Sequence, residues 1–261
     1  MKTKDGNISH WLITGTFTAP QYTESFFPPA LIRRASVEDR TPVFVENREI
    51  PFWLVIPYSA VTTQEPADLI IWGHGFLGNG NTDGLSGWAN ENNAAMLGTS
   101  FYGWADDDFA SIEYAVLNMH YFQHQAERLE QAMINQVVMI KTFMGICSDL
   151  PEFYYEDGNE KLIDTTNPTY TGYSNGALRG PSIIGLSPDL NRGVLWAGGS
   201  SFSHIIERCT QYDKFYFVFA SEYGYDNQLD RAVAMSIMPV SYTHLRAHET
   251  EADLVCRLLL E

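Results

Sequence analysis

The chain has 261 residues, a formal net charge of −16 and 45% hydrophobic residues, a composition typical of a folded globular protein with a large core. So acidic a chain lacks the surplus of lysine and arginine that nucleic acids and anionic membrane surfaces require, so neither partner is expected. No apolar run reaches the length of a transmembrane helix, and no apolar segment typical of a secretory signal follows the first residues. The compartment stays open, because the chain could start inside a longer exported protein.

The first half of the chain predicts several strands. Residues 8–19 are rich in β-branched and aromatic side chains and predict a strand, and the Pro-rich residues 20–42 predict a loop. Residues 43–57 predict two strands around a polar turn, forming an antiparallel edge. Residues 68–72 form a short, continuous apolar run, which is typical of a central strand buried on both faces.

A glycine-rich loop, Gly73-His-Gly-Phe-Leu-Gly-Asn-Gly80, follows this central strand directly. In a hydrolase such a loop supplies one backbone donor of an oxyanion hole, here near Gly75 or Phe76. A plain glycine-rich linker is the alternative. A nucleotide-phosphate loop is disfavoured, because neither a Lys-Ser/Thr ending nor a G-x-G-x-x-G pattern is present.

The middle of the chain predicts a helix over residues 88–97, a strand over 97–102 and a long helix over 127–146, whose apolar residues recur every three to four positions. Three consecutive aspartates, residues 106–108, fit the start of a helix better than a metal site, since neighbouring side chains cannot converge on one ion. His120 and His124 are four apart, but no third ligand follows. No metal or cofactor is therefore predicted.

The most informative stretch is Gly172-Tyr-Ser-Asn-Gly176, a G-x-S-x-G pattern. A β-prone run precedes it and a helix-compatible segment, residues 177–186, follows, which is the strand–turn–helix setting of a nucleophile elbow. Gly172 and Gly176 lack the Cβ atoms that would collide in so sharp a turn. Ser174 is then the candidate nucleophile, and the N–H of Asn175 a candidate oxyanion donor. An ordinary glycine-rich turn is the alternative.

The last third predicts a strand over residues 191–199 and helices over 201–209 and 226–238. Strands that alternate with helices indicate an α/β fold with a mostly parallel central sheet and helices on both faces. Outside the last 22 residues the chain has two cysteines, Cys147 and Cys209, which predict either two thiols or a single disulfide bridge.

Taken together, Trp72-Gly-His-Gly-Phe76 and Gly172-Tyr-Ser-Asn-Gly176 resemble the α/β-hydrolase superfamily. Glu127-Arg-Leu-Glu-Gln131, Asn135-Gln136 and Leu186-Ser-Pro-Asp-Leu-Asn-Arg-Gly-Val194 resemble bacterial lipase- and esterase-like members. The resemblance implies that Ser174 attacks the acyl carbonyl of a carboxylic ester or lipid, and that the oxyanion sits between the N–H groups of Asn175 and of Gly75 or Phe76. It implies no cofactor.

The last 22 residues differ in kind. Val240-Ser-Tyr-Thr-His-Leu-Arg-Ala-His-Glu-Thr250 and Leu254-Val-Cys-Arg-Leu-Leu-Leu-Glu261 resemble translated sequencing adapter. Two regions are therefore expected: residues 1–239, a partial α/β-hydrolase domain that lacks its C-terminal strands, and residues 240–261, a tail foreign to the domain.

The triad order of the family is serine, then acid, then histidine. After Ser174 the histidines are His204, which follows too soon, and His244 and His248, which lie in the adapter-like tail. The sequence therefore predicts that the acid and the histidine are encoded beyond residue 239 and that this chain is inactive, whereas its parent is an active hydrolase. An acyltransferase or peptidase using the same serine, and a non-catalytic binding module of the same fold, are the alternatives.

Overall fold

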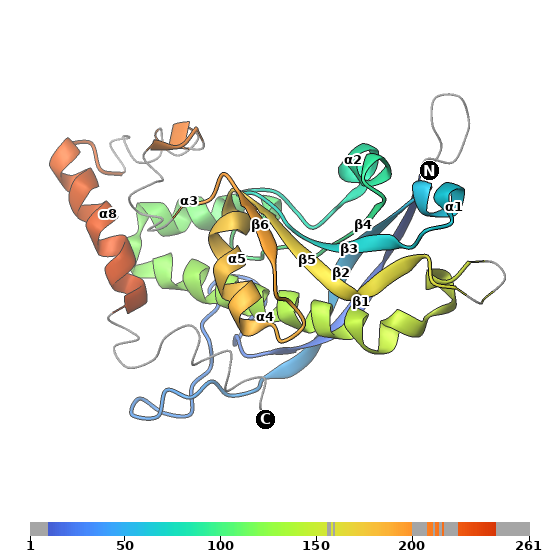
Figure 1. Ribbon diagram of the computed structural model, residues 1–261. Coiled ribbons are helices and arrows are strands. Elements are labelled where there is room, and N and C mark those ends of the chain that lie inside the picture. The colour runs from blue at the N-terminus through green and yellow to red at the C-terminus, as the bar shows by residue number, and fades with distance from the viewer. Residues whose placement is uncertain are drawn as a thin grey trace.

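One mixed, mostly parallel sheet with helices on both faces organises the protein (Figure 1). The structure, a computed structural model, describes residues 10–155, 158, 160–199, 208–210, 212–213, 216 and 224–243. Within these residues the sheet has six strands in the order β1-β2-β4-β3-β5-β6. The predicted α/β class with a mostly parallel sheet is confirmed.

The antiparallel side of the sheet is one long pair of strands. β1 (His10–Gln21) pairs with β2 (Glu46–Pro57) over its whole length, from His10 opposite Pro57 to Gln21 opposite Glu46. The predicted turn between two strands within residues 43–57 is wrong. The polar residues taken for a turn lie on the exposed part of one strand, where Glu49 accepts hydrogen bonds from the hydroxyls of Thr16 and Thr18.

The parallel part consists of β3 (Ala67–Gly73), β4 (Ala94–Gly98), β5 (Ile163–Tyr173) and β6 (Gly193–Trp196). The central strand expected at residues 68–72 is β3. The predicted helix at 88–97 and strand at 97–102 are wrong in their bounds. The short helix α2 (Ser86–Glu91) ends earlier, and all five residues of β4 are buried. A run of alanine, methionine and leucine suits a helix by propensity, but burial between two layers makes it a strand.

Helices cover the two faces of the sheet unequally. Figure 1 shows α4 (Phe122–Met144) and α5 (Asn175–Leu186) on one side and α2 on the other. The larger core cluster lies under α4 and α5, and the smaller one lies under α2. β3 serves both, since Leu69 and Ile71 belong to the larger cluster and Ile70 to the smaller one, as alternation along a strand requires.

The other helices lie at the ends of the sheet or along α4. α1 (Ser59–Thr63) follows β2, α3 (Phe109–Leu117) packs on α4, and α8 (Gln228–Thr243) contacts the start of α4. Between residues 83 and 153 the chain also forms single 3-10 turns: η1 (Asp83–Leu85), η2 (Asp106–Asp108), η3 (Met119–Tyr121), η4 (Ile146–Asp149) and η5 (Pro151–Phe153). The predicted helix at 201–209 lies mostly outside the described residues.

Two further expectations can be compared with the described residues. Cys147 and Cys209 form no disulfide bond with each other. None of the described helices combines the length and the apolarity needed to cross a bilayer.

Candidate active site

Ser174 occupies the turn between β5 and α5, at the edge where the parallel strands end. Its φ of 52° and ψ of −110° lie in a region that residues other than glycine rarely adopt. A conformation of this kind costs about 1–3 kcal/mol and persists only where neighbouring contacts enforce it. Two backbone hydrogen bonds enclose the turn: Ser174 N–H donates to Trp196 O at 2.9 Å, and Gly176 N–H donates to His74 O at 2.9 Å.

The two glycines of the pattern are required by close backbone contacts. A Cβ on Gly172 would overlap the carbonyl group of Gly176, and a Cβ on Gly176 would overlap the carbonyl group of Gly73. The backbone is therefore packed so closely here that no side chain fits between its segments. These segments are the end of β5, the start of α5 and the end of β3. This is the steric reason given for these glycines from the sequence.

The hydroxyl of Ser174 is not used by the helix that it precedes. Ser174 is the N-cap residue of α5, yet its side chain makes no capping hydrogen bond, and the residue is half-buried. Asn175 is the first residue of α5, so its N–H belongs to the first turn, where N–H groups have no acceptor within the helix. The side chain of Asn175 is buried, and its Nδ2 has no hydrogen-bond partner among the described residues.

The loop at residues 74–78, which follows β3, is held by His74. Its Nε2 accepts a hydrogen bond from Phe101 N–H at 2.7 Å, so the proton lies on Nδ1, which donates to Gly75 O at 2.7 Å. Burial lowers the pKa of His74 to about 4, and the bond to Gly75 and the charge of Asp106 oppose this shift only partly. His74 is therefore neutral at neutral pH, and its ring connects the 74–78 loop to Phe101 by hydrogen bonds.

Gly75 is the residue of this loop that meets the serine. A Cβ built on Gly75 would lie 3.5 Å from the Cβ of Ser174 and 3.0 Å from the ring of Tyr173. Phe76 is half-buried, and its ring packs on Trp104 with 4.9 Å between centroids. The structure thus brings together Ser174, Asn175 and the loop containing Gly75 and Phe76.

No histidine in the described part of the chain is hydrogen-bonded to Ser174. His10 pairs with Asp83, and His74 is bonded as above. His120 meets the ring of Tyr121 edge-on, and His124 stacks on it. His204, His244 and His248 lie outside the described residues, as does most of the adapter-like tail. No group of three or more His, Cys, Asp or Glu residues in the described part is arranged to hold a metal ion.

One of the three aspartates at 106–108 has a role that the sequence did not reveal. Asp108 precedes α3, as an N-cap residue does, but its side chain makes no capping bond to that helix. It accepts hydrogen bonds from the N–H groups of Gly103 and Ala105 instead and pairs with Arg128 of α4. Arg128 lies within the Glu127–Gln131 segment that the sequence singled out, but nothing in the pattern linked it to an aspartate 20 residues earlier.

Comparisons with known proteins give distant likenesses only. No family model and no curated protein matches the chain. One matching solved structure is acetyl xylan esterase 1 from Thermoanaerobacterium sp. JW/SL YS485, at 14% identity over 74% of this chain and 60% of that chain, with a TM-score of 0.40. A ferulic acid esterase from Anaeromyces mucronatus matches at 14% identity over 77% of this chain and 63% of that chain, with a TM-score of 0.41. The acylaminoacyl peptidase of Pyrococcus horikoshii matches at 12% identity over 87% of this chain and 30% of that chain, with a TM-score of 0.40. The chain spans less than two thirds of each of these proteins. With every TM-score below 0.5, its function has to be inferred from the geometry around Ser174.

Proposed function

We propose that this chain carries the nucleophile half of an α/β-hydrolase that cleaves carboxylic esters. Ser174 attacks the acyl carbonyl, and the oxyanion is bound by the N–H of Asn175 and an N–H of Gly75 or Phe76. The observation that carries the proposal is the conformation of Ser174. A non-glycine residue is held at φ 52°, its hydroxyl is not used for capping, and Gly75 lies against it.

The proposal gives each element of the turn a chemical role. A strained serine between a strand and a helix presents its hydroxyl above the sheet edge, where the first N–H groups of α5 carry partial positive charge. Each oxyanion donor of this type is worth roughly 3 kcal/mol of the reaction barrier. The neutral His74 is not the base, because both ring nitrogens are already hydrogen-bonded. In this proposal the acid and the histidine come from sequence beyond residue 239.

A second candidate is a non-catalytic binding module of the same fold. It is favoured by one observation: among the described residues no histidine is hydrogen-bonded to Ser174. An acyltransferase or a peptidase would use the same serine with a different acceptor or substrate. The distinction between hydrolase and binding module lies in whether the serine can be acylated at all.

The test is phosphonylation by an alkyl fluorophosphonate, read by mass spectrometry at Ser174. The protein translated from the uninterrupted reading frame is expected to be labelled and to hydrolyse short acyl esters, and its Ser174→Ala variant is expected to do neither. The 261-residue chain itself is expected to show no Ser174-dependent turnover. Absence of labelling in the longer protein would exclude the hydrolase and leave the binding module.

A further inference from the structure

A buried ion pair joins α4 to the loop that follows β4. Arg128 Nη1 lies 2.5 Å from Asp108 Oδ1, and the two side chains are 5% and 3% exposed. An ion pair removed from water to this extent is retained only when the remaining hydrogen-bonding capacity of its members is also used. The other oxygen of Asp108 meets this condition.

Asp108 Oδ2 fixes the backbone of the loop at residues 99–108. It accepts hydrogen bonds from Gly103 N–H at 2.6 Å and from Ala105 N–H at 2.9 Å. Gly103 has a φ of 97°, and a side chain there would collide with the backbone of Gln125 and Leu129 in α4. The loop is therefore drawn tightly against α4 at the level of Arg128.

This loop in turn holds the 74–78 loop beside Ser174. Leu77 N–H donates to Trp104 O at 3.0 Å, Asp106 N–H donates to Gly78 O at 3.0 Å, and Phe101 N–H donates to His74 Nε2 at 2.7 Å. These three bonds connect the two loops along their whole length. A displacement of residues 101–106 would therefore displace Gly75, which lies against the serine.

From this chain of contacts we infer that Asp108 and Arg128 are positioning residues for the oxyanion donor of the 74–78 loop. The inference rests on the proposed function. The pair holds residues 103–105 against α4, and these residues fix the register of the 74–78 loop relative to Ser174. Neither side chain touches the reacting atoms; both act through the backbone of the loop between them.

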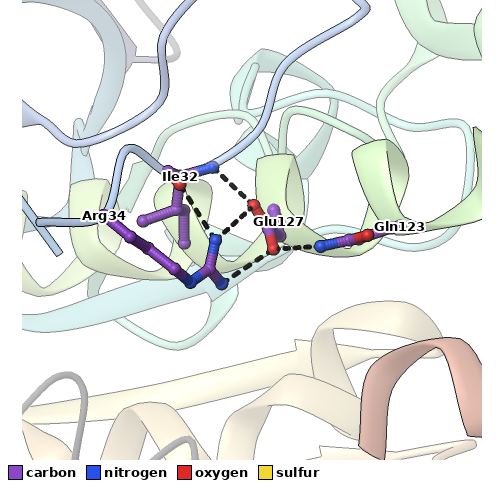
Figure 2. A network of polar contacts seen from close by, with 4 residues as sticks. All are labelled: Ile32, Arg34, Gln123 and Glu127. Atoms are coloured by element: carbon purple, nitrogen blue, oxygen red, sulfur yellow. Dashed lines mark hydrogen bonds and ion pairs between the residues drawn. The ribbon is translucent and has the colours of Figure 1, made fainter. Parts of the chain in front are cut away.

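A second ion pair of α4, between the buried Glu127 and the half-buried Arg34, provides a control with a matched carboxylate. Glu127 accepts hydrogen bonds from Ile32 N–H at 2.5 Å, Arg34 Nη2 at 2.9 Å and Gln123 Nε2 at 2.8 Å, as Figure 2 shows. Its side chain is 3% exposed, like that of Asp108. Glu127 holds the segment around residues 32–34. That segment takes no part in the three hydrogen bonds that hold the 74–78 loop. The two carboxylates differ in the loop that they hold and not in burial.

The first experiment measures amide hydrogen exchange in the 261-residue chain. Exchange of Leu77 N–H is divided by that of Ile71, an amide in the core of β3, so that opening confined to the loop, which raises the ratio, is distinguished from global unfolding, which does not. Asp108→Ala is expected to raise this ratio about tenfold or more, and Glu127→Ala to leave it within about threefold. If Asp108→Ala does not fold, Asp108→Asn serves, with an expected rise of at least about threefold because its Nδ2 faces the guanidinium. An unchanged ratio, or an equal rise in Glu127→Ala, would overturn the inference.

The second experiment asks whether the position of the loop matters to catalysis. In the protein translated from the uninterrupted reading frame, Asp108→Asn is expected to lower kcat for Ser174-dependent ester hydrolysis about tenfold, with KM within about twofold, and Glu127→Gln to change neither. If Asp108→Asn raised the exchange ratio of the 74–78 loop but left kcat unchanged, the positioning role of Asp108 would be overturned. Absence of turnover in the unmodified protein would instead contradict the proposed function. The exchange ratio would still decide whether the Asp108–Arg128 pair holds the 74–78 loop.

Discussion

The turn at residues 172–176 and the loop at residues 74–78 meet at one edge of the sheet, but different forces hold them. The serine turn is held by backbone packing: two glycines allow three backbone segments to touch, one of them the end of β3, and Ser174 takes a strained φ of 52° between them. The 74–78 loop has a turn of its own, in which Gly78 N–H donates to Gly75 O at 3.0 Å and Leu77 takes a φ of 56°, but bonds from outside the loop place it beside the serine. Its position depends on hydrogen bonds to residues 101–106, and through them on Asp108 and Arg128.

The difference shows how a rigid site can be built from two sources. Close backbone packing cannot relax without unfolding the strand end, because protein interiors are packed as densely as organic crystals. A polar network holds only while each of its members is satisfied. Substitutions in the serine turn should therefore act on global stability, and substitutions in the network should act on the 74–78 loop first.

The largest effect is expected for Gly176→Ala. The added methyl group would overlap the carbonyl of Gly73, and to relieve the overlap either the end of β3, where Gly73 pairs with Gly172, or the start of α5 has to move. We expect the free energy of unfolding to fall by more than about 3 kcal/mol, measured by urea denaturation.

Gly185→Ala, in the same helix, is the control for helix propensity. A Cβ at Gly185 has no heavy atom within 4 Å, so the substitution is expected to stabilise the protein by up to about 1 kcal/mol. A loss below about 1 kcal/mol for Gly176→Ala would show that the turn can open, which contradicts a serine turn held by backbone packing.

The next effect concerns the network and depends on pH. His74 has a pKa of about 4 in the folded protein against 6.5 for an ordinary histidine, because burial disfavours its charged form. Between these values the unfolded chain binds the proton more strongly. The stability contributed by neutral His74 is therefore complete above pH 6.5 and is lost as the pH falls toward 4, by about 3 kcal/mol.

Urea denaturation of the wild type and of His74→Gln at several pH values isolates this contribution. The carboxylates titrate in both proteins and cancel in the difference. The stability advantage of the wild type is expected to shrink by about 3 kcal/mol between pH 7 and pH 4. If the difference in the free energy of unfolding between the two proteins stayed constant across this range, His74 would not be held neutral by burial. Its hydrogen bonds to Phe101 and Gly75 would then contribute less than their short lengths indicate.

The same contrast explains what could be predicted from sequence. The serine turn was predicted because its sequence signal lies within five consecutive residues and the strand and helix that flank them. The contact of Gly176 with Gly73 that the turn also needs lies outside that signal. The central strand β3 and most of α4 were predicted for a similar reason, since hydrophobic periodicity is local. The oxyanion loop could be proposed from Gly75 and Phe76, but nothing in the sequence revealed what holds it.

The failures share a cause. Residues 46–57 form one strand and residues 94–98 form another because of partners far along the chain, which override local propensity. The aspartates at 106–108 do lie at the start of a helix, as expected, and Asp108 is the N-cap residue of α3. Its pairing with Arg128 could not be predicted, because Arg128 is on a different helix. The tight contact of Gly75 with Ser174 likewise needs the pairing of β3 with β5, which the sequence implies only as a fold class.

The smallest effect is expected for Asn175→Ala, which removes a side chain from the serine turn without touching its backbone. Asn175 is 3% exposed, and its Nδ2 has no partner among the described residues, so little hydrogen-bond energy can be lost. We expect the free energy of unfolding to change by less than about 1 kcal/mol, since alanine also favours the helix. Asn135→Ala is the matched control.

Asn135 is 1% exposed, and its Oδ1 accepts hydrogen bonds from Gln21 and Gln131, so its removal is expected to cost about 2 kcal/mol or more. Equal losses for the two variants, measured by urea denaturation, would show that Asn175 has a structural partner and that its side chain helps to hold the turn. A small loss at Asn175 alone would mean that the backbone contacts of Gly172 and Gly176 suffice to fix the position of Ser174. The N–H proposed as an oxyanion donor would then be held by the main chain alone, independently of the side chain that follows the serine.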